Sequence, residues 1–102
     1  MNEFDALTKV LRDFAAERNW ERFHTPKNLA MALAGEAGEL VAEFQWLTPA
    51  ESERSGLTPE QIAAIGMEVA DVQIYLLRLA DVLGLDIPKV VREKVEINRS
   101  RF

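Results

Sequence analysis

The chain has 102 residues, 48% of them hydrophobic, and a formal net charge of −5. That length supports a single domain, residues 1–102, with a modest core. The acidic balance argues against a nucleic-acid polymer as partner, because such binding needs a basic surface, and the absence of cysteine excludes disulfides and thiolate chemistry. Uncharged runs are far shorter than the roughly 20 residues of a membrane span, and the first residues lack the apolar run of a signal peptide. We therefore expect a cytoplasmic protein with no membrane partner.

The first half of the chain predicts two helices. Apolar residues recur at helical spacing between Phe4 and Phe14, behind Asn2 as an N-cap, so the first helix should end near Arg18. A short connector over residues 19–24 follows. Thr25 and Pro26 then supply an N-cap and a proline in the first helical turn. They start a second helix that we expect to reach about residue 46.

The second half predicts two more helices after a loop. Thr48-Pro49 repeats the start signal, but Ser55-Gly56 soon ends that piece, so we expect only a short helical turn over residues 50–54. Thr58-Pro59 opens a third helix that runs to residue 83, where Gly84 is a natural stop. Asp86 then caps a fourth helix. No segment shows strand alternation, and the four helices with short loops predict an all-α four-helix bundle.

Carboxylates lie on the apolar faces of the two middle helices. The only charged side chains are Glu36, Glu39 and Glu43 in residues 29–44, and Glu68 and Asp71 in residues 62–77. At about 100° per residue, Glu36 and Glu68 fall in the same sectors as the leucine, isoleucine and valine side chains of their helices. The acids should therefore point into the protein.

Inward acids need neutralisation by protonation, by basic partners or by metal ions. Two facing helices with Glu-x-x-Glu and Glu-x-x-Asp would form an all-oxygen site, which suits Mg²⁺ or Mn²⁺. A di-iron site would use Glu-x-x-His instead, and the only histidine lies in a connector, so iron is disfavoured. Either motif alone is common on hydrated helices, and a solvent-facing position is the structural alternative. A metal site of this kind would hold a polyphosphate and activate water.

Longer motifs carry a family resemblance over nearly the whole chain. The run GEAGEL at residues 35–40, with FQW at 44–46, and the run EVADV at residues 68–72, with IYL at 74–76, resemble the all-α MazG-like nucleotide pyrophosphohydrolases. Residues 14–20, 23–29 and 94–98 resemble the dCTP pyrophosphatase branch of that family.

The resemblance implies a hydrolase that cleaves a nucleoside triphosphate to the monophosphate and pyrophosphate, with dCTP or a modified deoxynucleotide as substrate. Four acids would then be the metal ligands and catalytic residues: Glu36, Glu39, Glu68 and Asp71. The magnesium ions would stabilise the departing pyrophosphate, and one acid, or a water between acid and metal, would deprotonate the nucleophile. Which acid does so stays open.

The resemblance also implies contacts with the phosphates. Lys94, Asn98 and Arg101 form one polar stripe at i, i+4 and i+7 on the last helix, and a solvated helix end whose cations suit the helix dipole is the alternative. Lys27 and Asn28 could approach the ligand from the start of the second helix. Ordinary capping explains Asn28 nearly as well.

Base recognition would use rings and hydrogen-bonding side chains. The candidates are Trp20, His24, Trp46 and Tyr75. Tyr75 lies one turn beyond Asp71 on the same face, and aromatic rings can stack on a pyrimidine while an imidazole bonds a base edge. The structural alternatives are core or loop-anchoring tryptophans and a helix-entry histidine.

The second helix has no charged solvent face. Opposite Glu36 it carries Ala34, Gly38, Val41 and Gln45, and a helix that is apolar all round in so short a chain indicates contact with other subunits. We expect a homo-oligomer, and the resemblance suggests a tetramer in which Trp46 acts in a neighbouring subunit's site. The alternative function is a non-catalytic helical module that binds nucleotides or a partner protein.

Overall fold

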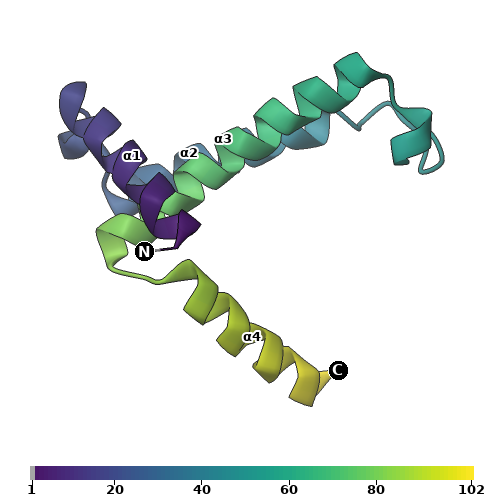
Figure 1. Ribbon diagram of the computed structural model, residues 1–102. Helices are drawn as coiled ribbons and strands as arrows, with labels where there is room; N and C mark the ends of the chain where they lie inside the picture. Colours follow the sequence, from purple (N-terminus) through teal and green to yellow (C-terminus); the bar gives the residue numbers. More distant parts are fainter. Residues whose placement is uncertain (1) are drawn as a thin grey trace.

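The computed structural model describes residues 2–102, and this part of the chain is all-helical (Figure 1). The α-helices are α1 (Glu3–Glu17), α2 (Pro26–Ala42), α3 (Pro59–Leu83) and α4 (Ile87–Arg101), with short 3₁₀ turns η1 (Glu21–Phe23) and η2 (Arg54–Gly56). The all-α class and the number of helices predicted from the sequence are confirmed.

Local capping residues fix the helix starts. The side chains of Asn2, Thr25, Thr58 and Asp86 each accept a hydrogen bond from a backbone N–H in the first turn of their helix. These bonds satisfy donors that the helix itself leaves unpaired. Gly84 ends α3 in the left-handed conformation, at φ 69°, which a residue without Cβ adopts at little cost.

Helix α2 ends earlier than the sequence pattern predicts, at Ala42 and not near residue 46. The backbone N–H of Glu43 bonds the carbonyl of Leu40 at 3.1 Å, and that of Phe44 bonds Val41 at 2.9 Å. These i→i−3 bonds tighten the chain into turns, as often occurs at helix ends. No glycine or proline marks the change, so the pattern gave no stop signal there.

The loop between α2 and α3 contains a capping box, but no long helix follows it. Thr48 and Glu51 bond each other reciprocally, from backbone N–H to side-chain oxygen, at 2.8 and 3.2 Å. The Ser52 N–H bonds the Thr48 carbonyl at 3.0 Å and the Glu53 N–H bonds the Ala50 carbonyl at 3.2 Å, which closes the expected short helical turn, and η2 follows it.

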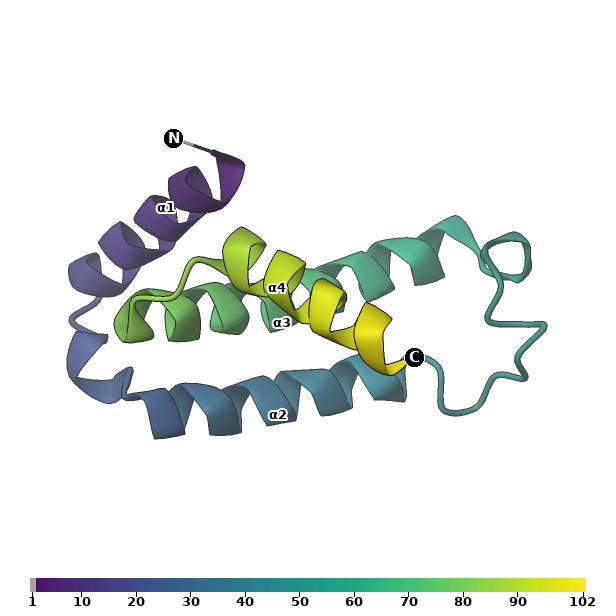
Figure 2. The same cartoon turned by 90° about the horizontal axis from the view of Figure 1, so that it is seen from below.

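The first three helices pack together, whereas α4 extends away from them. Helix α2 runs along α3, and α1 crosses α3 near its C-terminal half (Figures 1 and 2). The buried apolar residues lie where these helices meet: Ala15, Leu29, Leu77 and Ala80. In the described part of the chain, α4 makes no extended packing with another helix, although it meets α3 around one hollow. The predicted four-helix bundle is therefore not closed within one chain.

The open shape leaves apolar surface uncovered. The radius of gyration is 16.1 Å, against about 13 Å for a compact chain of this length. Val41 and Met31 on α2 are each 64% exposed, and Trp46 beyond it is 86% exposed. Among residues 2–102, none of the helices combines the length and the apolar character of a membrane span.

Candidate functional site

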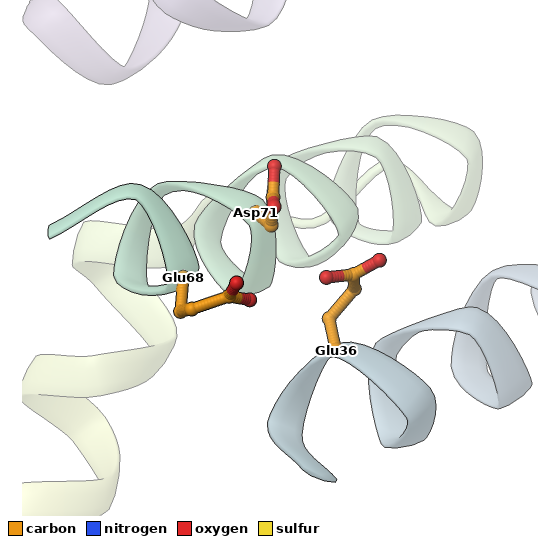
Figure 3. A group of neighbouring side chains, drawn as sticks. All are labelled: Glu36, Glu68 and Asp71. Carbon is orange, nitrogen blue, oxygen red and sulfur yellow. The ribbon is translucent and has the colours of Figure 1, made fainter. Parts of the chain in front are cut away.

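Three of the four predicted acids meet between α2 and α3. Glu36 on α2 and Glu68 and Asp71 on α3 offer carboxylate oxygens within 4.8 Å of one another, and all three side chains are half-buried. Figure 3 shows Glu36 reaching from α2 towards the helix that carries the other two. We call these residues the acidic trio. Their assembly follows from the helical spacing, because Glu68 and Asp71 lie three residues apart on one helix face.

The electrostatics of the trio favour binding of a proton or a cation. Within residues 2–102, the Oε2 atom of Glu68 is buried and has no hydrogen-bond partner. Burial raises the pKa of Glu68, and the negative charges of Asp71, Glu36, Glu39 and Glu43 raise it further. A buried acceptor of this kind is costly unless a proton or a cation satisfies it. An oxygen-only donor set with one unsatisfied carboxylate oxygen fits a hard divalent cation.

Glu39 lies outside the trio. Its side chain is exposed, and it is not among the carboxylates that converge within 4.8 Å. It is still near enough for its charge to raise the pKa of Glu68. Glu43 is half-buried directly after α2, and its charge also raises the pKa of Glu68.

Three of the four predicted base contacts line one pocket. Trp20, His24 and Tyr75 surround a hollow of about 140 Å³ together with Phe14. The Phe14 and Trp20 rings meet edge to face, with centroids 5.5 Å apart and an interplanar angle of 81°. We call this the aromatic pocket. Trp46 is the exception, since it lies in the turn after α2 and does not line the hollow.

Sequence reasoning missed a buried cation beside this pocket. Arg78 on α3 is 6% exposed; it donates from Nε to Nδ1 of His24 at 3.1 Å and from NH1 to Oδ2 of Asp81 at 3.0 Å. Burial lowers the pKa of His24, and the charge of Arg78 lowers it further. The available signal was that Arg78 is the only basic residue of α3 and lies seven positions after Asp71, on the same face.

The phosphate candidates are not grouped with the acidic trio in one chain. Lys94, Asn98 and Arg101 lie on α4, which does not pack along α2 or α3. Lys27 is exposed at the start of α2. The Asn28 side chain donates to the carbonyl of Phe23 at 3.1 Å, which supports the structural interpretation of that residue.

The fold and the acidic trio define the class of this protein, which is all-helical with a candidate cation site between two long helices. Comparison with known proteins identifies its family. Residues 32–101 match the MazG-like family. The chain belongs to this family. The matched range contains the whole acidic trio and α4, and it begins after the residues of the aromatic pocket that precede α2.

The relatives agree with this assignment. The chain is 49% identical over 96 residues to "dCTP pyrophosphatase 1" of Homo sapiens, covering 94% of this chain and 56% of that protein. It is 36% identical over 77 residues to a "dATP/dGTP diphosphohydrolase" of Cyanophage S-2L, covering 62% of this chain and 73% of that one. The chain thus spans about half the length of the first of these relatives.

A solved structure has the same fold. A pyrophosphatase from Archaeoglobus fulgidus superposes with a TM-score of 0.90 at 35% sequence identity, and the match covers 100% of this chain and 94% of the other. The arrangement with α4 extending from the first three helices is therefore shared with a structure of nearly the same length.

Proposed function

We propose that this protein is a magnesium-dependent nucleoside triphosphate pyrophosphohydrolase that converts dCTP, or a modified relative, to the monophosphate and pyrophosphate. The observation that carries the proposal is the acidic trio with its buried, unpartnered Glu68 oxygen. A site whose carboxylate oxygens fit a divalent cation suits a substrate that binds as a metal complex of its phosphates. The names of the two nucleotide-hydrolysing relatives support the reaction class.

The trio would hold Mg²⁺, with Mn²⁺ as an alternative, and Glu39 would join it once the ion neutralises the cluster. When bound, the cation supplies charge neutralisation of the triphosphate and a lowered pKa of water. A carboxylate of the cluster accepts the proton of the attacking water. Water oxygen bonds to the α-phosphorus, the bond to the bridging oxygen breaks, and pyrophosphate leaves with that oxygen.

The remaining candidates would bind the rest of the substrate. Trp20, His24 and Tyr75 enclose the base in the aromatic pocket. On α4, the cationic side chains of Lys94 and Arg101 and the amide of Asn98 are suited to bind phosphate oxygens. Lys27 would offer another cation from the start of α2. Helix α4 does not pack along the helices of the acidic trio, and Trp46 does not line the aromatic pocket. The α4 residues and Trp46 would therefore complete the site from a neighbouring copy.

We therefore propose that the active form is a homo-oligomer, with a tetramer as the expected size. Apolar residues on α3 and α4 support this. Leu76, Leu79, Val90 and Val91 line an open hollow of about 450 Å³ where α4 leaves α3. An exposed apolar surface of this kind often marks a site of contact with another protein chain.

Product analysis tests the function directly. Purified protein is incubated with deoxy- and ribonucleoside triphosphates, with Mg²⁺ or with chelator, and the products are separated by chromatography. We expect monophosphate and pyrophosphate with Mg²⁺ and no reaction with chelator. Glu68→Gln and Asp71→Asn should each lower kcat at least about 100-fold, since they weaken charge stabilisation of the transition state.

A matched control separates the site from general charge effects. Glu60 lies on the same helix as Glu68, in its exposed first turn, so Glu60→Gln should keep wild-type activity. Intact nucleotides throughout the panel, or release of a diphosphate and orthophosphate, would contradict the proposal. The non-catalytic binding module would then be the better interpretation, and nucleotide binding without turnover would support it.

A further inference from the structure

The clearest feature outside the acidic trio is the contact between the buried Arg78 and the half-buried His24. The Arg78 side chain is 7% exposed, and its Nε donates to Nδ1 of His24 at 3.1 Å. Arg78 belongs to α3, whereas His24 lies directly after η1. The contact therefore connects the segment before α2 with the helix that carries two of the three acids.

This contact determines where His24 holds its proton. Arginine is a donor only and keeps its charge in proteins, so its partner atom must offer a lone pair. Nδ1 of His24 therefore carries no proton, and the neutral ring carries its proton on Nε2. The lowered pKa of His24 agrees, because burial and the charge of Arg78 both oppose a charged ring. His24 is thus a neutral ring with one available donor.

Two further residues hold Arg78 in place. Asp81, one turn further along α3, accepts from Arg78 NH1 at 3.0 Å. Arg12 on α1 donates to both oxygens of the same carboxylate, at 3.0 and 2.7 Å. Asp81 is 15% exposed, so these charged hydrogen bonds are partly shielded from water. The guanidinium that bonds His24 is therefore fixed through contacts that include α1.

The pair lies beside the place where a base would bind. His24 and Arg78 both line the aromatic pocket with Trp20 and Tyr75. Asp71, Tyr75 and Arg78 follow one another at i, i+4 and i+7 on one face of α3. The helix rises about 6 Å between Asp71 and Tyr75. A nucleotide with its phosphates at the acidic trio can therefore direct its base to this pocket.

We propose that Arg78 is a positioning residue that fixes His24 as an Nε2–H donor to an acceptor atom of the base, a carbonyl oxygen or a ring nitrogen. The inference rests on the proposed function and adds a basis for base selection. A base that presents a donor at this position would leave two buried donors facing each other, which disfavours its binding.

The tautomer is measured first, in the nucleotide-free wild-type protein. The chain has one histidine, so nitrogen-15 NMR of labelled protein reports on His24 without ambiguity. We expect a protonated Nε2 and an unprotonated Nδ1. Arg78→Met should give a mixture of tautomers, while Arg92→Met, an exposed arginine on α4, should leave the spectrum unchanged. A proton on Nδ1 in the wild type would overturn the proposal.

A double-mutant cycle then tests whether Arg78 acts through His24. His24→Ala should raise KM for dCTP by about tenfold, the value of one hydrogen bond, with little change in kcat. Arg78→Met should have a similar effect, and the double variant should cost no more than His24→Ala alone. Additive losses would mean that Arg78 acts independently and would overturn the proposal. Circular dichroism verifies folding, and Arg78→Leu, which also removes the donor, replaces the methionine variant if that one unfolds.

A nucleotide titration separates this inference from the proposed function. Addition of dCTP without metal should shift the His24 Nε2–H resonance of the wild type. An unchanged resonance in a protein that hydrolyses dCTP would overturn the role of His24 and leave the proposed function intact. A shifted resonance without hydrolysis in the presence of Mg²⁺ would support the role of His24 in binding the base and would contradict the proposed function.

Discussion

Arg12 on α1 holds Asp81 on α3 through two hydrogen bonds, from Nε to Oδ2 at 3.0 Å and from NH2 to Oδ1 at 2.7 Å. This paired geometry is the favoured one between guanidinium and carboxylate. It fastens α1 to the C-terminal half of α3, and Arg78 shares the same carboxylate. Together these contacts lower the pKa of Asp81, with the hydrogen bond from Arg12 as the main cause.

The first prediction concerns stability in acid. Since the folded-state pKa of Asp81 is lowered, its carboxylate stabilises the fold above its ordinary pKa, about 4, and this contribution is lost as the pH falls below that value. Asp81→Asn should reduce the free energy of unfolding by about 1–2 kcal/mol at pH 7, and the difference from wild type should shrink towards pH 3. Urea denaturation at several pH values measures this.

The ion pair between Lys9 and Asp13 supplies the control for that measurement. Its side chains are 63% and 56% exposed, so Asp13→Asn should change stability by no more than about 0.5 kcal/mol. Equal effects of the Asp13 and Asp81 substitutions at pH 7 would contradict the role given to Asp81.

The second prediction concerns stability without metal. Because burial and neighbouring acids raise the pKa of Glu68, its ionised form destabilises the metal-free fold near neutral pH. Glu68→Gln should therefore raise Tm in chelator relative to wild type. Added Mg²⁺ should raise Tm of the wild type, because it binds the folded state, and should have little effect on the variant. Thermal denaturation at fixed protein concentration measures both changes.

Glu60→Gln, on the exposed first turn of α3, should behave as wild type in both conditions. A wild-type Tm that ignores millimolar Mg²⁺ and Mn²⁺ would argue against a cation site at the acidic trio.

The features predicted correctly from the sequence are local ones. Helix starts depend on caps only a few residues long, such as Thr58 with Gln61. The convergence of Glu36 with Glu68 and Asp71 follows from helical periodicity and from antiparallel packing of neighbouring helices. The exclusion of Glu39 from the acidic trio depends on the exact rotation of α2, which periodicity fixes only roughly.

The features that were missed depend on distant contacts. Arg78 and His24 are 54 positions apart in the chain, so no local pattern pairs them. The early end of α2 is a change of backbone hydrogen bonding without a signal residue. The direction of α4 depends on the turn after Gly84 and on the surfaces against which α4 can pack. Its sequence pattern does not show whether its apolar side chains face this chain or another copy.

The third prediction concerns assembly. Val41 on α2 is 64% exposed in one chain, on the face that has no charged residue. If a second copy covers this face, Val41→Glu buries an unpaired charge there and should dissociate the oligomer. Light scattering after size-exclusion chromatography should give the wild type a multiple of the 11.5 kDa chain mass and the variant a smaller one.

Ala16 on α1 is exposed and provides a control, because Arg12 and Asp13 lie one turn before it on the same charged face. Ala16→Glu should keep the wild-type mass. A monomeric wild type would overturn the expected oligomer.

The fourth prediction concerns Trp46 and the site of a neighbouring subunit. The ring is 86% exposed and contributes little to the fold of one chain, so Trp46→Ala should change the free energy of unfolding of a single chain by no more than about 0.5 kcal/mol. It should nevertheless raise KM for the nucleotide. Trp20→Ala, by contrast, should also destabilise the protein, since its ring packs edge to face on Phe14.

Mixed oligomers determine which subunit Trp46 serves. Trp46→Ala subunits keep their acids, and Glu68→Gln subunits keep their tryptophan. If Trp46 acts in a neighbouring subunit's site, oligomers formed from both variants contain sites with an intact acidic trio and an intact ring. The KM of the mixture should then approach that of the wild type in steady-state hydrolysis assays. A KM equal to that of the Trp46→Ala protein alone would place the ring in its own subunit's site, because no arrangement of the mixture then reunites the two groups.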